Sequence, residues 1–387
     1  MKVPNNNVSV VGGAGHIGLP LSCYIASKGH KVTIVDTNEN VLKNLKNDNL
    51  PFNEVKLEEY WKLAKSNKIE LSSKTQSIEN SDFIFITLGS SSEIEDINIF
   101  NNLINDVLQN AQKGSKIILR STINIETIEA IENNELFKDK NLVLAYCPER
   151  IAEGMSLVEL PTMPQIIGVR NDSDFEVFQK FFESIGISSR KTTFKNAVFL
   201  KLFTNTYRYA EFSLVNEFYN IAKEQLIDFD EIVSLATDKY PRLKNLPSKG
   251  FVGGPCLIKD TKTFIKEYDK NNNLLSSVQN VNDKFFENTF KDCLQAFDNK
   301  TVIQLGLSFK PNSDDLRSSL SLKFYFYLVE NGFNVYPVDK FVKSEDIKIY
   351  KFDDVQDFSD NILITTYHDY FKELNLSSKK VVVVGNK

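Results

Sequence analysis

Short apolar runs alternate with helix-like segments along the first 150 residues of the chain. Runs at 8–11, 81–89, 114–122 and 141–150 have the length and composition of buried strands, and a helical pattern precedes each of the last three. The first run is followed by glycines, a helix-like stretch to Ser27 and a second apolar run that ends in Asp36. This order predicts a doubly wound α/β domain.

The pattern becomes continuously helical from about 195 to 240. Residues 196–225 contain neither Gly nor Pro, and aromatic residues fall on more than one face of the predicted helix. Such a helix is expected to be buried on two sides, in a homodimer interface or as a spine between domains. Lys201, Asn205 and Arg208 share one stripe of it, which is either a solvated face or the wall of a site.

An α/β pattern returns near the C-terminus. The plan of the N-terminus is repeated here: a strand from Thr301 is followed by a loop with Lys310 and Arg317, a helix and a second strand ending in Asp339. Further apolar runs follow at 361–369 and 380–386. The expected fold class is therefore α/β, with two Rossmann-like doubly wound domains joined by a central long-helix domain. We expect the domains to span 1–194, 195–297 and 298–387.

Composition and charge narrow the classes of protein and partner. The 387 residues are 42% hydrophobic and 25% charged with a net charge of −5, and no basic run could follow a nucleic-acid backbone. No apolar stretch is long enough to cross a membrane and no signal peptide is visible, so a cytoplasmic protein is expected. The four cysteines lie far apart without C-x-x-C spacing, so neither a disulfide framework nor a metal site is expected.

The glycine-rich sequence GAGHIG at 13–18 predicts a dinucleotide-binding loop. Alone, the pattern could be an ordinary glycine turn, but here it joins a strand to a helix, and Gly13, Gly15 and Gly18 would let the backbone approach a pyrophosphate. Asp36 can bind a ribose diol and would repel a 2′-phosphate, so the expected cofactor is NAD. His16 and Ile17 complete the expected cofactor loop.

Four polar residues follow the third and fourth apolar runs and should face the ligand. They are Ser121, Thr122, Glu149 and Arg150. A helix N-cap is the favoured interpretation for Ser121. For Glu149 the alternative is a solvated loop carboxylate.

One cysteine stands in a glycine-rich context, in the sequence FVGGPCLIKD at 251–260. Gly253 lets the backbone pass close to a ligand, and Lys201 and Lys259 are candidate cations for activating the Cys256 thiol, although packing is the commoner fate of a cysteine. The three histidines offer no obvious base for a Cys-His protease. A cysteine beside a nicotinamide suggests aldehyde oxidation through a thiohemiacetal and a thioester.

Six ordered motifs resemble the UDP-glucose/GDP-mannose (nucleotide-sugar) dehydrogenase family along essentially the whole chain. They are GAGHIGLPL, the ST at 121–122, CPERIAEG at 147–154, KLFTNTYR at 201–208, GFVGGPCLIKD at 250–260 and GLSFKPNSDDLR at 306–317. The resemblance implies oxidation of a UDP-sugar C6 alcohol to a carboxylate with two NAD. It is greatest to UDP-N-acetyl-D-mannosamine dehydrogenases, and it suggests a role in making surface polysaccharide precursors.

The resemblance also implies roles for individual residues. Cys256 is similar to the nucleophile, Lys201 and Asp260 to the pair that handles the alcohol proton, and Asn205 to a positioning donor. Glu149 resembles the carboxylate that assists thioester hydrolysis, and Thr122 the hydroxyl that orders water. Lys310 is similar to a nucleotide-sugar contact and Arg317 to a pyrophosphate contact. Arg150, Arg208 and Gly253 complete the expected substrate-binding set.

The motifs do not agree on the sugar. Pro148-Glu149-Arg150 and the lysine stripe resemble the N-acetylhexosamine enzymes, whereas Pro255 departs from that subgroup and Lys259 resembles the UDP-glucose type. Leu320, where the family usually has proline, also departs from the pattern. The alternatives are a UDP-glucose 6-dehydrogenase, a two-electron hydroxyacid dehydrogenase that needs no cysteine, and a catalytically silent NAD-binding protein.

Overall fold

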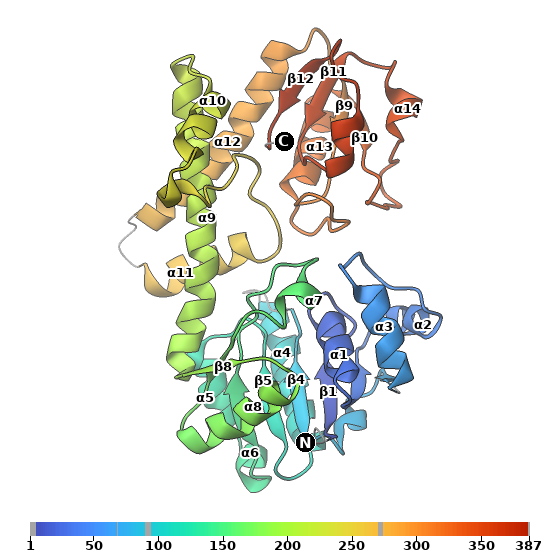
Figure 1. The fold of residues 1–387 in the computed structure, drawn as a ribbon, viewed down its shortest axis with the longest axis vertical. Coiled ribbons are helices and arrows are strands. Elements are labelled where there is room, and N and C mark those ends of the chain that lie inside the picture. Colours follow the sequence, from blue (N-terminus) through green and yellow to red (C-terminus); the bar gives the residue numbers. More distant parts are fainter. Residues whose placement is uncertain (1–4, 68, 90–93, 270–273, 386–387) are drawn as a thin grey trace. The chain divides into compact units, whose positions relative to one another are not determined.

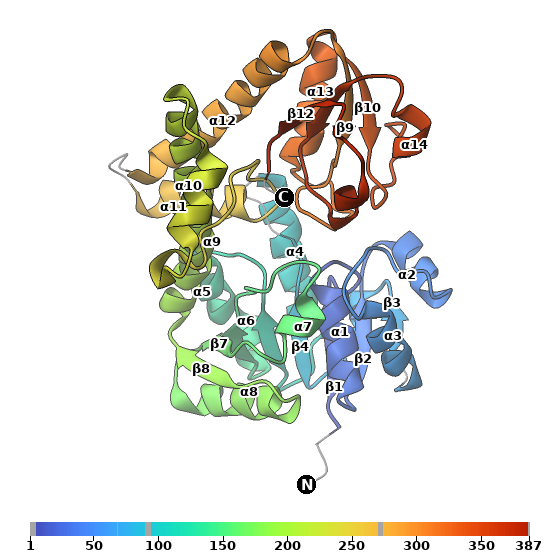
Figure 2. The same cartoon turned by 45° about the horizontal axis from the view of Figure 1, so that its top comes forward.

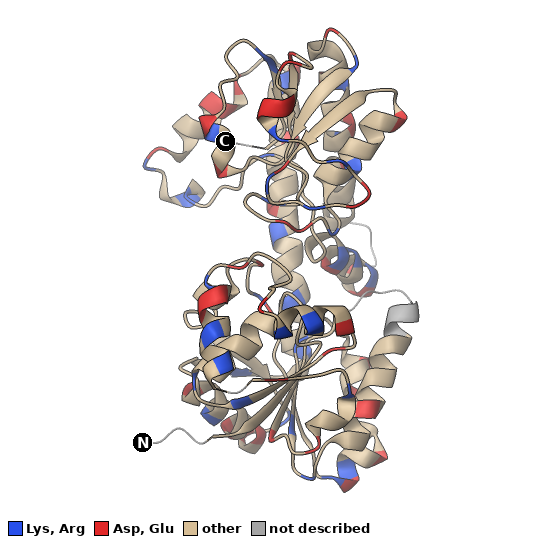
Figure 3. Cartoon of the chain, turned by 90° about the vertical axis from the view of Figure 1, so that its right-hand side faces the viewer, with Lys and Arg blue, Asp and Glu red and all other residues tan. Residues whose placement is uncertain are grey.

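The structure is a computed structural model that describes residues 5–67, 69–89, 94–269 and 274–385. The chain divides into two compact units, Met1–Leu202 and Phe203–Lys387. Basic and acidic residues are interspersed along both units (Figure 3). Within the described ranges, no helix combines the length and the apolar character needed to cross a bilayer.

The first unit is built on an eight-stranded sheet in the order β3-β2-β1-β4-β5-β6-β7-β8 (Figure 1). The strands are β1 (Asn7–Val11), β2 (Lys31–Val35), β3 (Glu70–Ser72), β4 (Phe83–Ile86), β5 (Lys116–Leu119), β6 (Val143–Tyr146), β7 (Gln165–Gly168) and β8 (Ser189–Thr192). Neighbouring strands pair in parallel, apart from β6 and β7. The chain order reverses at β1, next to β4, and in sheets of this kind ligands bind at such a reversal.

Helices cover both faces of this sheet. They are α1 (Gly18–Ser27), α2 (Glu39–Lys46), α3 (Leu57–Ser66), η1 (Thr75–Ile78), α4 (Ile94–Asn110), α5 (Ile125–Asn133), α6 (Glu135–Asp139), α7 (Ser156–Glu159) and α8 (Asp172–Ser184). Helices α1 and α3 pack side by side in both views (Figures 1 and 2).

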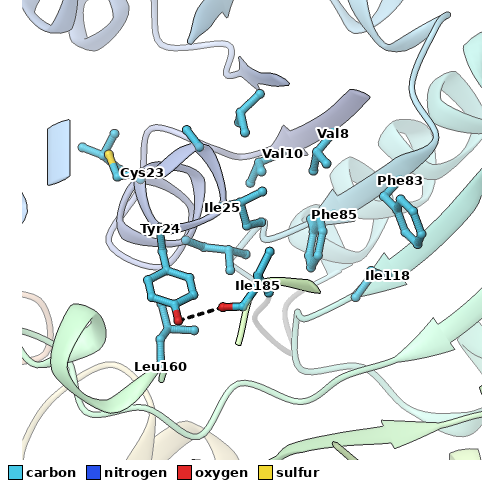
Figure 4. Close-up of a cluster of buried hydrophobic side chains, with 14 of the residues drawn as sticks. Val8, Val10, Cys23, Tyr24, Ile25, Phe83, Phe85, Ile118, Leu160 and Ile185 are labelled. Carbon is cyan, nitrogen blue, oxygen red and sulfur yellow. Dashed lines mark hydrogen bonds between the residues drawn. The ribbon is translucent and has the colours of Figure 1, made fainter. Parts of the chain in front are cut away.

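Alternate residues of the central strands enter two separate apolar cores. In β4, Phe83 and Phe85 pack with α1 and α8, whereas Ile84 and Ile86 pack with α4 and α5. The period of two along a strand produces this alternation, and it explains why β4 is apolar at every position. In the first core, the Tyr24 hydroxyl donates to the Ile185 carbonyl at 3.0 Å and so satisfies its polar end (Figure 4).

The long helix α9 (Phe194–Glu224) begins in the first unit and continues into the second. It ends earlier than the predicted helical segment, because Leu226 adopts a left-handed conformation with φ of 57°. Asp228 then caps the separate helix α10 (Phe229–Thr237) by accepting from the backbone N–H groups of Asp230 and Glu231. The continuous pattern from about 195 to 240 is therefore two helices.

The second unit contains a four-stranded parallel sheet in the order β10-β9-β11-β12. Its strands are β9 (Thr301–Leu305), β10 (Asn334–Val338), β11 (Asn361–Ile364) and β12 (Lys380–Val383). The other elements are η2 (Pro241–Leu243), α11 (Leu257–Tyr268), α12 (Leu274–Ala296), α13 (Leu320–Glu330), α14 (Phe352–Val355) and η3 (Asp369–Glu373). The predicted fold class is confirmed, while the domain boundaries at 194 and 297 stay predictions.

Candidate active site

The glycine loop after β1 is packed too tightly for side chains at two of its glycines. A Cβ on Gly13 would lie 2.5 Å from the Val10 carbonyl oxygen, and one on Gly18 would lie 2.4 Å from that of Gly12. Gly15 differs, because its nearest neighbour would be the Gly12 oxygen at 3.6 Å. The loop thus needs Gly13 and Gly18 to fold, whereas the open space at Gly15 is suited to close approach of a ligand.

Asp36 closes this loop from the end of β2. Its carboxylate accepts from the backbone N–H of Ala14 at 3.1 Å and from that of Asn38 at 3.0 Å. The side chain is half-buried, so part of it still faces solvent, where a ribose diol could bind. The glycines and this carboxylate fit an NAD adenosine and pyrophosphate.

Residues outside the loop hold His16. Its ring stacks on Phe52 with centroids 4.0 Å apart, and its Nδ1 lies 3.4 Å from a carboxylate oxygen of Glu153. Ile17 immediately precedes α1 and is exposed. Both residues therefore lie at the N-terminal end of α1, where the helix dipole favours an anion.

Gly18 and Gly15 give a matched pair of variants. Gly18→Ala is expected to lower the free energy of unfolding by about 1–3 kcal/mol, because its Cβ overlaps backbone atoms. Gly15→Ala should leave stability unchanged but weaken NAD binding about tenfold. Urea unfolding and calorimetric titration with NAD measure the two effects. Unchanged NAD affinity in Gly15→Ala would contradict the assignment of the loop.

Ser121 does not cap a helix, so that part of the prediction is wrong. Its hydroxyl donates to the Leu88 carbonyl at 2.6 Å and ties the end of β5 to the residues after β4. Asn124 caps α5 instead, accepting from the backbone N–H of Thr127, because it stands directly before the first helical residue. Thr122 lies between them and is half-buried. The cofactor roles predicted for Ser121 and Thr122 stay predictions.

Glu149 forms a buried ion pair with Arg120, a residue that the sequence patterns did not single out. The Arg120 guanidinium donates to Oε2 of Glu149 and also, at 2.8 Å, to the side-chain oxygen of Gln165. Oε1 of Glu149 accepts from the backbone N–H groups of Arg150 and Ile151. Glu149 is therefore a fixed, buried carboxylate, which excludes the solvated-loop alternative.

The neighbours of Glu149 decide its ionisation. Burial raises the pKa of this carboxyl, but the charge and hydrogen bond of Arg120, the Ile151 N–H and the charge of Lys201 together hold the net pKa below its ordinary value. Glu149 is thus ionised at neutral pH. Arg150 takes a separate partner, because its guanidinium donates to the Pro164 carbonyl at 2.7 Å.

Lys201 and Asn205 lie one turn apart on α9, and both are buried. The Lys201 ammonium donates to the Glu149 carbonyl at 2.7 Å within the first unit. In the second unit, the Asn205 side-chain amide donates to the Asp260 carboxylate at 2.6 Å. Arg208 is exposed, so the predicted stripe is buried at its first two positions only. Their burial and partners exclude a solvated face at these two positions, while their predicted role in a site stays a prediction.

Cys256 is exposed and directly precedes the first residue of α11, while the other three cysteines are buried. Burial raises the pKa of the Cys23, Cys147 and Cys293 thiols to about 12, which suits packing rather than reaction. Cys256 instead lies at the N-terminal end of α11, where the helix dipole is positive. Asp260 lies one turn further along and is fully buried, and the Lys259 ammonium lies 3.9 Å from its Oδ1.

The loop before Cys256 is packed against the loop before α13. A Cβ on Gly253 would lie 2.9 Å from the Ser318 carbonyl oxygen, and Gly254 has a φ of +95°. Pro255 is half-buried beside them. These glycines are thus required by the close contact of two loops within the second unit.

Lys310 and Arg317 belong to the loop between β9 and α13. The Lys310 ammonium lies 5.5 Å from the centre of the Phe309 ring, and the Arg317 guanidinium donates to both carboxylate oxygens of Asp315. Leu320 begins α13, and Ser319 caps the helix by accepting from the backbone N–H of Leu322. The predicted ligand roles of Lys310 and Arg317 stay predictions.

A dinucleotide loop on a doubly wound sheet, followed by a second parallel sheet, is the architecture of a nucleotide-binding α/β oxidoreductase. Models of the UDP-glucose/GDP-mannose dehydrogenase family match nearly the whole chain: the NAD binding domain at 6–186, the central domain at 195–299 and the UDP binding domain at 303–386. The chain therefore belongs to this family. The predicted family, oxidoreductase class, NAD cofactor and three-domain architecture are confirmed.

Relatives and solved structures agree with this membership. The UDP-N-acetyl-D-mannosamine dehydrogenase of Methanocaldococcus jannaschii is 31% identical, over 100% of this chain and 92% of that protein. The UDP-D-ManNAc dehydrogenase structure from Pyrococcus horikoshii has a TM-score of 0.87 at 24% identity, covering 98% of this chain and 95% of that one. A UDP-glucose dehydrogenase structure from Pyrobaculum islandicum has a TM-score of 0.88 at 20% identity, covering 99% and 95%. The fold alone thus does not distinguish between the two sugars.

Proposed function

We propose that the protein oxidises the C6 alcohol of a UDP-N-acetylhexosamine, UDP-N-acetylmannosamine, to the uronic acid, and so supplies a precursor of surface polysaccharide. NAD bound at the glycine loop supplies the oxidant, and two molecules are reduced for each alcohol taken to the acid. The observation that carries the proposal is the exposed Cys256 at the N-terminus of α11, one turn from a buried Asp260 that Asn205 holds.

Each step of the proposed reaction is assigned to particular residues of the chain. The Cys256 thiolate adds to the C6 aldehyde to form a thiohemiacetal, and removal of a second hydride leaves a thioester. Lys201 and Asp260 handle the alcohol proton through a water and stabilise the developing oxyanion, while Asn205 positions the reacting groups. Water then cleaves the thioester, which releases the carboxylate and restores the thiol.

Glu149 is proposed to assist the cleavage of the thioester. Its ion pair with Arg120 keeps it ionised, so it can accept a proton or orient a water as a carboxylate. The two backbone N–H groups on Oε1 hold the side chain in one rotamer, which suits an orienting role. Thr122 is proposed to order the same water.

A direct comparison of substrates tests the proposed function. UDP-ManNAc, UDP-GlcNAc, UDP-GalNAc and UDP-glucose are supplied in turn, and NADH and uronic acid are both quantified. We expect UDP-ManNAc to have the highest kcat/KM and to yield two NADH per sugar. A clear preference for UDP-glucose, which Pro255 and Lys259 would favour, would overturn the proposed sugar. One NADH per sugar would instead indicate a two-electron dehydrogenase.

A homodimer formed through the central helix is proposed from the outer surface of α9. Five large apolar side chains form a stripe of helical spacing and are each about half exposed: Phe203 at 49%, Tyr207 at 55%, Leu214 at 57%, Phe218 at 54% and Ile221 at 48%. Contiguous apolar surface of this kind indicates a site of protein association.

Two charges in this stripe should break the dimer. The variant with both Leu214→Glu and Phe218→Glu is expected to raise the dimer dissociation constant at least about a hundredfold, because it buries two unpaired carboxylates in place of apolar groups. Sedimentation velocity measures the change. Leu63→Glu is the matched control, because Leu63 is also an exposed apolar residue, at 45%, but lies on α3. A double variant that stays dimeric would contradict the interface.

A further inference from the structure

His368 is fully buried in the second unit, and the chemistry proposed above makes no use of it. Its Nε2 lies 2.9 Å from Oδ2 of Asp339, and its Nδ1 accepts from the backbone N–H of Asn312 at 2.9 Å. Because a backbone N–H can only donate, Nδ1 carries no proton, so Nε2 is the nitrogen that donates to Asp339. The imidazole is thus fixed in one tautomer between β10 and the loop that contains Lys310.

Asp339 directly follows β10 as Asp36 directly follows β2, but its surroundings are different. Whereas Asp36 is half-buried, Asp339 is 2% exposed. Its Oδ2 accepts from the Leu307 N–H at 2.9 Å as well as facing His368, and its Oδ1 accepts from the Phe341 N–H at 3.0 Å. In the first sheet the acid after the strand is partly open to solvent. In the second sheet the corresponding acid, Asp339, is buried and supports His368 instead.

The backbone on both sides of Lys310 is tethered to the residues that follow β11. Before it, the Thr366 hydroxyl donates to the Ser308 carbonyl at 2.6 Å, and the Ser308 hydroxyl donates to the Lys310 carbonyl at 2.9 Å. After it, His368 holds Asn312, which has a left-handed φ of 56°. The Asn312 side chain also exchanges two hydrogen bonds with Asp369, so the His368 acceptor is one of three contacts that hold Asn312 in this less favourable conformation, and the one that acts on its backbone.

We infer that His368 is a positioning residue for nucleotide-sugar binding, which acts by fixing the loop at Asn312 so that Lys310 meets the UDP-sugar in one orientation. The inference rests on the proposed function and on the predicted contact between Lys310 and the nucleotide sugar. A long lysine loses side-chain freedom on binding, so a fixed backbone lowers the entropy that remains to be lost. His368 touches neither substrate nor cofactor in this role.

Two substitutions of His368 separate the role of each ring nitrogen. In His368→Asn the side-chain oxygen lies close to the position of Nδ1 and can still accept from Asn312. In His368→Gln the amide reaches the position of Nε2 and can face Asp339, but the acceptor for Asn312 is lost. Both variants keep one of the two histidine contacts, so a general loss of stability would affect both.

The test measures UDP affinity by titration calorimetry on the intact chain, together with KM, kcat and the urea midpoint of each variant. His368→Gln is expected to raise the UDP dissociation constant and KM about tenfold with kcat retained, whereas His368→Asn stays close to wild type. The exposed Lys343 gives the control variant Lys343→Ala, which should change neither value. Equal UDP affinity in the Gln and Asn variants, or the reverse order, would overturn the inference.

Failure of the proposed function would be seen separately. If no UDP-sugar yields NADH but UDP affinity still follows the Asn and Gln order, the proposed reaction fails and the positioning role stands. If the wild-type protein does not bind UDP at all, the positioning role is overturned whatever the NADH assay shows.

Discussion

Replacement of Cys256 by alanine is expected to lower the rate of uronic acid formation at least about a thousandfold, because the covalent steps have no other nucleophile. NAD affinity should be largely retained, since the variant leaves intact the glycine loop and Asp36, which fit the adenosine and pyrophosphate of NAD. Uronic acid release is measured with NADH formation, so that oxidation to the aldehyde alone is also detected. A Cys256→Ala variant that makes acid at the wild-type rate would exclude the thioester route.

The buried cysteines provide the matched control for this result. Cys23 has the same side chain but is fully buried in α1, and the pKa of its thiol is raised to about 12. Cys23→Ala should therefore change stability slightly and leave acid formation intact. Treatment with an alkylating reagent should modify Cys256 alone and abolish acid formation to the same extent as Cys256→Ala.

Arg120→Leu is expected to lower the free energy of unfolding by about 3–5 kcal/mol, because it leaves the Glu149 carboxylate buried without its counter-charge. Urea unfolding at pH 7 measures the loss. Arg170→Leu is the control, because Arg170 pairs with Glu132 at an exposed position and should cost about 0.2–1 kcal/mol. Equal losses of stability in the two variants would show that the buried ion pair contributes no more to folding than the exposed one.

The Arg120–Glu149 ion pair also predicts how the difference in stability between the wild type and Arg120→Leu depends on pH. The folded pKa of Glu149 is depressed, so its contribution to stability is complete above the unfolded value of roughly 4.3 and is lost as the pH falls through the folded pKa. The stability difference between wild type and Arg120→Leu should therefore shrink in acid. A difference that grows below pH 4 would contradict the ion pair.

The sequence predicted the elements that repeat a simple pattern. The strands β4, β5 and β6 carry apolar residues on both faces, and β1 is rich in valine, so their short runs were recognisable. The short strands β3, β7 and β8 were missed, because sequences such as SRKT carry no such run and pair at the outer part of the sheet. The break after Glu224 was missed because Leu226, which is left-handed there, is an ordinary helix former.

The residues of the site were predictable where a motif named them, but their partners were not. Asn205 and Asp260 are far apart in sequence, and no spacing rule connects them. Arg120 gave one weak signal, a charge at the end of an otherwise apolar run, yet its pairing with Glu149 depends on β5 and β6 being neighbours. Ser121 was predicted to be the N-cap because it is the first hydroxyl residue after the apolar run. Helix α5 in fact begins after Asn124, which caps it.

All eight strands of the first sheet come from residues before 193, so this sheet can be completed while the rest of the chain is still being synthesised. Parallel pairing between distant segments folds slowly, and early completion gives it time before the second sheet emerges from the ribosome. Helix α9 follows directly, with its exposed apolar stripe. A nascent chain would therefore carry a folded first sheet and an uncovered aromatic surface at the same moment, which would favour formation of the proposed homodimer between two chains made close together.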